Sequence, residues 1–327
     1  MKKFISIILA LAFVTCVFSA CGEGVSRAPE KGGRLGIVTT IFPEYDWVMN
    51  LLGDKAEGAD VTMLLDTGVD LHSFQPTVED ILKISTCDLF IYVGGESDDW
   101  VEDALEEATN SDMIVINLLD VLGGSVKAEE LKEGMEQEDE EEEDGEEEEE
   151  YDEHVWLSLK NAAVICEAVT DALCTLDPEN ESVYKENLEN YKAKLLELDE
   201  RYADAASNAK TKTLLFGDRF PFRYLTDDYG LDYYAAFAGC SAETEASFET
   251  IKFLSDKVDE LQLKYVMTIE GGNGKIAQTI ISNTTSKDQT ILALDSMQAA
   301  TMKDVQSGVS YLSVMENNLG VLTTVLS

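Results

Sequence analysis

The sequence predicts an α/β protein of two Rossmann-like βα lobes, which are joined by a long backbone helix and face each other across a cleft. Short apolar runs rich in β-branched residues alternate with helical patterns, which is typical of parallel βαβ units. This alternation occurs twice, once on each side of a long helical segment. A Phe-Pro pair follows the first strand of each half, at Phe42-Pro43 and at Phe220-Pro221. Pseudo-symmetric lobes would explain that repetition.

The first half, residues 34–177, is predicted to contain four strands with helices between them. The helix that opens at Phe42-Pro43 should end at Gly53, because glycine suits a helix C-terminus. Thr77 can cap the helix that begins near Val78, with Asp80 at the third position after the cap. The predicted strands are 35–40, 61–65, 88–93 and 113–117, and the further helices are 100–108 and 157–173.

The two halves are joined by a predicted amphipathic helix at 178–209, where apolar residues recur every three or four positions. It would span roughly 45 Å at about 1.5 Å per residue. A coiled coil is an alternative, but the segment has only about four heptads. The second half, 210–327, then repeats the plan. Its predicted strands are 212–216, 230–236, 265–269 and 290–294. Its predicted helices open at Arg219-Phe220-Pro221-Phe222 or lie at 248–261, 276–283 and 309–325.

The N-terminus predicts export. Residues 1–20 combine a short positive start with an uncharged apolar stretch, as in a signal peptide. Small residues before Cys21 are similar to a bacterial lipobox, so Cys21 is predicted to carry lipid, followed by a flexible leash at 21–33. A plain signal peptide or a signal anchor is the alternative. We therefore expect an extracytoplasmic protein held at the membrane by its lipid.

The charge of the chain excludes some partners. Lys and Arg number 24 against 65 Asp and Glu, a formal net charge of −41. Such a surface repels nucleic acid and attracts cations. Much of the excess lies at 136–153, where 15 of 18 residues are acidic. Because like charges repel, 127–151 is predicted to be a disordered, mobile surface loop. It could concentrate cations, or serve only as a solubilising insert.

The cysteines show no CxxC or zinc-ribbon spacing. Cys16 would leave with the signal peptide. Four cysteines remain besides Cys21, and we expect them to be free and buried, with a bridge that involves Cys166 or Cys174 as the alternative. They are Cys87, Cys166, Cys174 and Cys240.

The chain has only two histidines, and both lie at predicted loop-to-helix junctions. His72 is in residues 70–77, Asp-Leu-His-Ser-Phe-Gln-Pro-Thr, and His154 precedes Val-Trp-Leu-Ser. Ligands of open parallel sheets bind beyond the carboxyl ends of strands. Asp295 and the corner that contains Asp218 also follow predicted strands. If the lobes face each other, these residues converge, and such imidazoles and carboxylates suit Zn²⁺, Mn²⁺ or Fe²⁺.

With these motifs, the chain resembles the zinc- and manganese-specific solute-binding lipoproteins of bacterial ABC importers. The resemblance also includes Tyr229-Gly230-Leu231, Leu294-Asp295-Ser296 and the closing segment 311–319. It implies two α/β lobes joined by one rigid helix, with a divalent metal, Zn²⁺ or Mn²⁺, carried between them. It further implies a monomer that delivers the metal to an ABC permease membrane subunit. His72 would be the first ligand, His154 the second and Asp295 the fourth.

The third ligand departs from the family pattern. The family's histidine or glutamate falls at Arg219, and a guanidinium has no acceptor with which to bind a cation. Asp218 could turn inward instead, or Glu243 or Glu245 could reach in from the next loop. Arg219 could also pair with Asp295 or with a carboxylate of a loop. That arrangement would leave two or three protein ligands and water.

Other functions compete with metal capture. An altered site could hold a metal chelate or an anion, with the Arg219 guanidinium as partner. A surface metalloenzyme would need an open coordination position and a general base, and no HExxH, GxSxG or P-loop motif is present. A lipid-anchored adhesin would predict no effect of metal on stability. We therefore expect a receptor that is not an enzyme.

Overall fold

The computed structural model describes residues 33–136, 150–241 and 245–327. The predicted signal peptide, Cys21 with its predicted lipid and nearly all of the predicted leash lie outside these residues, as do 137–149 of the acidic run. Contacts place Leu35–Ser327 in one compact unit that contains both lobes. Among the described residues, no helix is long and apolar enough to cross a membrane.

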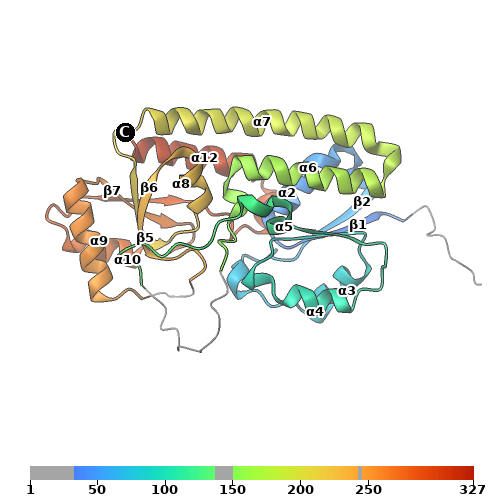
Figure 1. Ribbon diagram of the computed structural model, residues 1–327, viewed down its shortest axis with the longest axis horizontal. Helices are drawn as coiled ribbons and strands as arrows, with labels where there is room; N and C mark the ends of the chain where they lie inside the picture. The colour runs from blue at the N-terminus through green and yellow to red at the C-terminus, as the bar shows by residue number, and fades with distance from the viewer. Residues whose placement is uncertain (1–32, 137–149, 242–244) are drawn as a thin grey trace, which may run out of the picture. The chain divides into compact units, whose positions relative to one another are not determined.

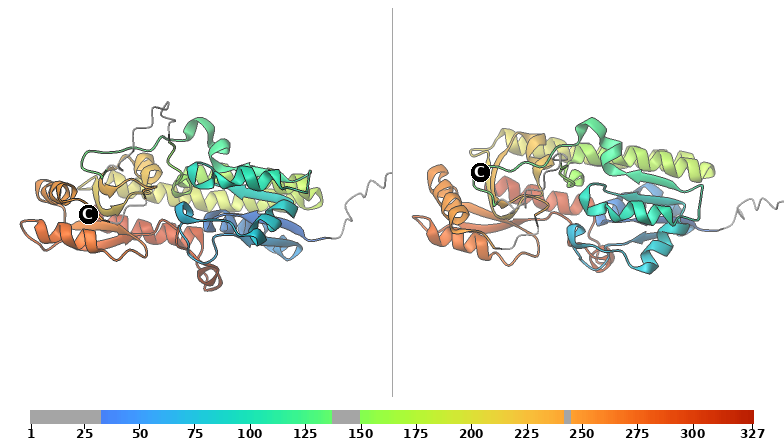
Figure 2. Two further views of the ribbon diagram at one scale, coloured as in Figure 1. Left: turned by 90° about the horizontal axis from the view of Figure 1, so that it is seen from below. Right: turned by 60° about the horizontal axis from the view of Figure 1, so that its bottom comes forward.

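The N-terminal lobe is built on a parallel sheet with the strand order β2-β1-β3-β4. Helices cover both faces of this sheet, α2 and α6 on one side and α3 and α4 on the other (Figures 1 and 2). The strands are β1 (Leu35–Thr39), β2 (Ala59–Met63), β3 (Leu89–Tyr92) and β4 (Ile114–Asn117). The helices are α2 (Phe42–Leu52), α3 (Val78–Thr86), α4 (Trp100–Glu106), α5 (Leu118–Leu122) and α6 (Leu159–Leu176).

The C-terminal lobe repeats this topology with a second parallel sheet of order β6-β5-β7-β8. The equivalent order of the two sheets explains the repeated strand and helix pattern of the sequence. The strands are β5 (Thr213–Arg219), β6 (Asp232–Phe237), β7 (Tyr265–Ile269) and β8 (Thr290–Leu294). The helices are α8 (Arg223–Tyr229), α9 (Phe248–Leu261), α10 (Lys275–Asn283), α11 (Met302–Gln306) and α12 (Tyr311–Val325).

The helix α7 (Glu181–Ser207) runs along both lobes (Figure 1). Its 27 residues correspond to a length of about 40 Å. Near its start, Asn187 donates to the Leu51 carbonyl of α2 at 2.9 Å. Near its end, the Tyr202 hydroxyl donates to the Met315 carbonyl of α12 at 2.6 Å. Buried side chains on one face of α7 therefore attach it to elements of both halves.

The predicted α/β class of two parallel lobes joined by a long helix is confirmed, and the differences are at element boundaries. The strand expected at 61–65 begins at Ala59, because Ala59 pairs with Leu35 of β1. Arg219 ends β5 instead of opening a helix, and the next helix begins at Arg223. The short helices α5 and α11 were not predicted, since each is one turn and shows little periodicity.

The described first part of the predicted loop, residues 127–136, packs against the C-terminal lobe, whereas the sequence predicted a mobile loop. Met135 is buried, and the Glu136 amide donates to the Ala236 carbonyl of β6 at 2.9 Å. The Lys132 ammonium lies 3.9 Å from the centre of the Tyr233 ring. Apolar and aromatic contacts that are remote in sequence thus hold residues up to 136 in place. The charge of the segment, on which the loop prediction was based, gives no sign of these contacts.

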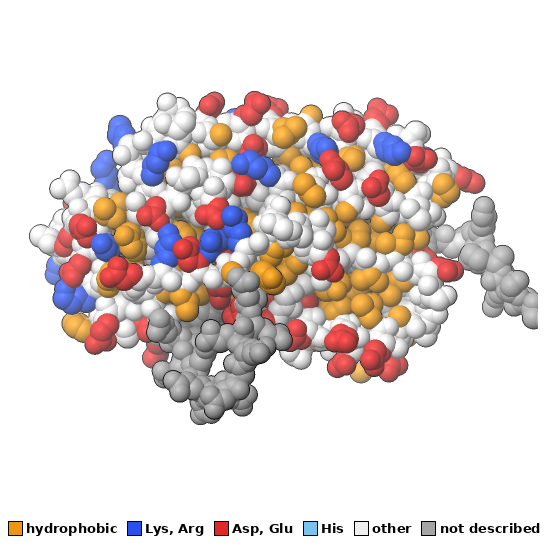
Figure 3. Space-filling view, viewed as in Figure 1, with side chains coloured by type: hydrophobic (Ala, Val, Ile, Leu, Met, Phe, Trp, Pro, Cys, Tyr) orange, Lys and Arg blue, Asp and Glu red, His pale blue; other side chains and the backbone are white. Residues whose placement is uncertain are grey.

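Acidic side chains are spread over the face shown in Figure 3, whereas basic ones gather over α7 and the C-terminal lobe. No histidine is visible on this face. The four described cysteines form no disulfide with one another, and Cys87 and Cys166 are buried as expected.

Candidate metal centre

His72 is positioned by a short turn that follows β2. The 3₁₀ helix η2 (Leu71–Ser73) contains it, and the Asp70 carboxylate caps this helix by accepting from the His72 amide at 3.1 Å. The loop before it is tied to the other lobe, because Thr67 forms an antiparallel bridge with Thr301. The backbone therefore presents the imidazole at the junction of the two lobes.

His154 lies just before the 3₁₀ helix η5 (Val155–Leu157). It is fully buried. The Asp152 carboxylate accepts from the His154 amide at 2.9 Å and lies 3.0 Å from Nδ1. The helix η5 is held to the C-terminal lobe, because the Trp156 indole donates to the Ser296 carbonyl at 2.8 Å. The sequence after the acidic run thus places a second imidazole at the same junction.

The two imidazoles face each other through their Nε2 atoms, which are 3.2 Å apart. Each Nδ1 atom already has a polar partner. The Nδ1 atom of His72 lies 2.7 Å from the Ser97 hydroxyl and 3.5 Å from the Glu153 carboxylate. On His154, the Asp152 carboxylate at Nδ1 holds the ring proton there and leaves the Nε2 lone pair for a cation. Two nitrogens bound to one tetrahedral Zn²⁺ would be about 3.4 Å apart.

The side chain of Glu153 is held by the turn after β3. The Ser97 amide donates to its Oε1 atom at 2.8 Å, while its buried Oε2 atom accepts no hydrogen bond within the described residues. Gly95 has a φ of +85°, and a Cβ atom there would lie 2.5 Å from the Glu153 carboxylate. Only glycine therefore allows the turn to approach the residue that supports His72.

Gln298, after β8, is a residue that the sequence analysis missed. Its Nε2 atom lies 3.1 Å from Nε2 of His72 and 3.0 Å from Nε2 of His154. The Ser296 hydroxyl donates to its Oε1 atom at 3.1 Å, so the amide group is oriented. The amide N–H groups can thus donate to both Nε2 atoms when no ion is bound. Its position beyond a strand end was the only signal in the sequence.

Cys240 is the second residue that was missed. Ligand atoms of His72, His154 and Cys240 all lie within 4.8 Å of one another. Cys240 follows β6 by three residues, after a close approach at Gly239. A Cβ atom at Gly239 would lie 3.0 Å from Cε1 of His154 and 3.0 Å from the Phe220 carbonyl oxygen. The strand-end rule that selected Asp295 would also have selected Cys240, which shows no metal-binding spacing.

Arg219 pairs with a loop carboxylate, one of the alternatives raised from the sequence. Its Nη2 atom lies 2.5 Å from Oδ2 of Asp70. Burial opposes ionisation of Asp70, but the hydrogen bond and charge of Arg219 outweigh it and lower the pKa of that carboxyl. The Nη1 group also donates to the Ser241 carbonyl at 3.5 Å. The guanidinium thus has partners in the His72 loop and in the loop of Cys240.

The carboxylates expected as third and fourth ligands accept hydrogen bonds from nearby backbone amides. Asp218 accepts from the Arg219 amide at 3.0 Å and from the Ile269 amide at 3.3 Å. Asp295 accepts from the Met297 amide at 2.8 Å. Neither belongs to the described group of ligand atoms around the imidazoles. Glu245 is exposed, and Glu243 lies outside the described residues.

The electrostatics around His72 favour its neutral imidazole, the form that binds metal. Burial, followed by the neighbouring His154 and Arg219, lowers the pKa of His72 to about 3, although Asp70 opposes the shift. Burial likewise raises the pKa of Glu153, and it raises the pKa of Asp295 to about 6 with help from the charge of Glu270.

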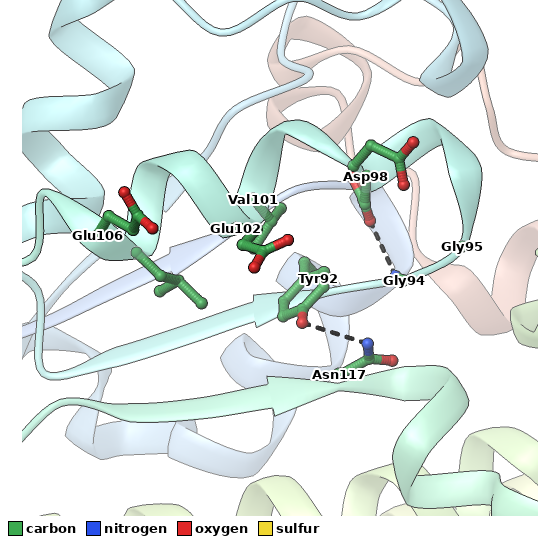
Figure 4. Close-up of a pocket in the computed structure, with 10 residues that line it drawn as sticks. Tyr92, Gly94, Gly95, Asp98, Val101, Glu102, Glu106 and Asn117 are labelled. Atoms are coloured by element: carbon green, nitrogen blue, oxygen red, sulfur yellow. Dashed lines mark hydrogen bonds between the residues drawn. The ribbon is translucent and has the colours of Figure 1, made fainter.

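A cavity of about 560 Å³ lies beside the centre, between the ends of β3 and β4 (Figure 4). In it, Asp98 accepts from the Gly94 amide at 2.9 Å, and Asn117 donates to the Tyr92 hydroxyl at 3.2 Å. The histidines do not line this cavity. The paired imidazoles, and not this cavity, therefore define the candidate centre.

Two parallel α/β lobes with paired imidazoles at their junction define the class of two-lobed solute-binding proteins. Residues 37–325 match the model of the family described as zinc-uptake complex component A, periplasmic. The chain belongs to this family.

Relatives and solved structures agree with this assignment. The high-affinity zinc uptake system protein ZnuA of Bacillus subtilis is 31% identical over 319 residues, 96% of this chain and 95% of the relative. The zinc-binding lipoprotein AdcA of Streptococcus pneumoniae is 31% identical over 326 residues, 98% of this chain but 60% of the relative. The crystal structure of the Zn(II)-bound ZnuA-like domain of that AdcA aligns with a TM-score of 0.70 and 28% identity, over 90% of this chain and 99% of the domain. The chain thus spans only 60–61% of the length of its streptococcal AdcA relatives.

Proposed function

We propose that this protein captures a divalent transition metal, with zinc as the physiological cargo, between His72 and His154 and delivers it to the permease of an ABC importer. The observation that carries the proposal is the 3.2 Å separation of the two Nε2 atoms. It is close to the edge of a zinc coordination tetrahedron. The names of the relatives, which are zinc-binding and zinc-uptake proteins, support zinc over manganese.

The proposal extends to the position of the protein in the cell. Cys21 would carry lipid and hold a monomeric receptor on the outer side of the membrane, near its permease partner. A relative that is named a lipoprotein supports this assignment. Metabolic labelling with a fatty acid, compared between the wild type and Cys21→Ala, would test it. Lipid that remains on the variant would contradict it.

The cargo ligands can be tested by metal titration. We expect the purified protein to bind one zinc ion, and His72→Ala and His154→Ala each to weaken binding by more than about 100-fold, because loss of a ligand exceeds the usual effect of its supporting residues. Zinc should also raise the thermal midpoint of the wild type, since it binds only the folded state. Unaltered affinity in both variants would contradict the site.

Asp295 and Asp218 remain proposed acid ligands, but each carboxylate would have to turn away from a backbone amide first. Asp295→Ala and Asp218→Ala separate these roles in the same titration. A ligand loses affinity when truncated, whereas a residue that only braces its own loop changes stability more than affinity.

A catalytic role is not part of the proposal. Turnover of ester or peptide substrates that depends on His72 would favour a surface metalloenzyme instead. Capture of an anion or a chelate by Arg219 is disfavoured, because Asp70 already occupies the guanidinium.

A further inference from the structure

We propose that Cys240 is the third protein ligand of the metal, and that its thiolate gives the centre a two-nitrogen, one-sulfur donor set that selects zinc over manganese. This inference rests on the proposed metal capture and assigns the ligand that the family pattern leaves open at Arg219.

The geometry brings the thiol to the imidazoles. The sulfur and the two imidazoles contribute ligand atoms within 4.8 Å of one another. In a tetrahedral zinc site, sulfur and nitrogen ligands would be about 3.6 Å apart, given metal–ligand bonds of about 2.3 and 2.1 Å. The sulfur would therefore have to move by at most about 1.2 Å to reach that separation. The backbone at Gly239 lies against the His154 ring, so the next residue, Cys240, is also beside that ring.

The loop that carries Cys240 is held from two sides. Its amide donates to the Glu129 carboxylate at 3.2 Å, from the segment that leads into the acidic run. The next carbonyl, that of Ser241, accepts from Arg219. Arg219 also binds Asp70, which caps the turn of His72. The residue at the family's ligand position has therefore become a positioning residue that joins two ligand loops.

The chemistry of a thiolate accounts for the expected selectivity. Thiolate and imidazole suit Zn²⁺, whereas Mn²⁺ prefers oxygen ligands. Burial raises the pKa of the Cys240 thiol, and the carboxylate of Glu129 adds to that shift. A divalent cation that binds the sulfur atom displaces the thiol proton, whatever the metal-free state. The supporting Asp152 and Glu153 carboxylates lie close enough to balance part of the ion's charge.

Cobalt substitution tests the sulfur ligand directly in the wild-type protein, without a variant that has to fold. Co²⁺ bound through Cys240 should show thiolate-to-cobalt charge-transfer absorption in the near ultraviolet. The band should persist in Cys174→Ser, a matched cysteine on α6, and disappear in Cys240→Ser. A cobalt complex of the wild type without this band would overturn the proposal.

Affinity measurements complete the test. Cys240→Ser should lose about 100-fold or more in zinc affinity while its manganese affinity stays equal or rises, and Cys174→Ser should match the wild type. The thermal unfolding midpoints of the two variants, measured without metal, show whether both fold. If Cys240→Ser retains wild-type zinc affinity, the thiolate assignment fails while metal capture stands. If the wild type binds no metal at all, metal capture fails as well.

Discussion

The Arg219 guanidinium reaches from the end of β5 to the loop that carries His72, where its Nη2 atom lies 2.5 Å from Oδ2 of Asp70. Asp70 in turn accepts from the His72 amide through its other oxygen. One ion pair thus links the C-terminal lobe to the turn that presents the first imidazole. Both side chains are partly shielded from solvent, with 18% and 27% exposed, so the pair is only moderately screened.

Replacing Arg219 by Gln should weaken zinc binding without removing a ligand. The substitution releases Asp70 and the Ser241 carbonyl together, so the ligand loops lose their common support. We expect about a 10-fold loss of affinity by calorimetry, in the range typical of supporting residues. The thiolate band of the cobalt complex should remain at saturating metal. Loss of the band at saturation would indicate that Arg219 does more than position the loops.

Replacing Asp152 by Asn should lower zinc affinity by roughly 10-fold, and replacing it by Ala should lower it further. The carboxylate accepts from Nδ1 of His154 and makes the ring a better donor to the metal. Asp112→Asn, an exposed acid, is the matched control. Equal affinities of all three variants and the wild type would show that ring orientation needs no carboxylate.

Replacing Asp46 by Asn should change the pH dependence of stability, independently of metal. Burial raises the pKa of Asp46 to about 6 from 3.8 in the unfolded chain. Neutral Asp46 therefore contributes fully to the stability of the folded state below pH 3.8, and this contribution is lost as the pH rises through about 6. Above that pH, we expect the free energy of unfolding of the variant to exceed that of the wild type by up to about 3 kcal/mol. Near pH 4 the two should differ little.

Urea unfolding at several pH values measures this difference. Asp54→Asn, at an exposed position of the same lobe, is the control and should follow the wild-type curve. An Asp46→Asn curve parallel to that of the wild type would contradict the assignment of the buried acid.

Neutralising the acidic residues of 137–149, by Gln and Asn at constant length, tests whether the run gathers cations. Glu136 is spared, because its side-chain carboxylate accepts a hydrogen bond from the Ser247 amide. If the run raises the local cation concentration, zinc association should slow at low ionic strength and match the wild type at high salt. Equal association rates at both salt concentrations would favour the solubilising role.

The sequence was informative about the fold and about the imidazole pair, because both follow from local patterns. Alternation of strands and helices defines the lobes, and the motifs around His72 and His154 place them at loop-to-helix junctions. Cys240 and Gln298 were missed because their approach depends on how loops of the second lobe meet the first. Asp218 and Asp295 accept hydrogen bonds from the amides of adjoining residues, and Asp218 also from the Ile269 amide of β7. Sequence spacing does not reveal this competition for the carboxylates.

The helix α7 has a consequence for how cargo is exchanged. It contacts elements of both lobes, and the ring of Tyr311 on α12 lies 5.2 Å from that of Trp47 on α2. Wide separation of the halves would have to break these buried contacts. We therefore expect an ion to enter and leave by displacing Gln298, whose side-chain amide contacts both imidazoles. The residence time of the ion would then depend on local hydrogen bonds at the junction and little on motion of whole lobes.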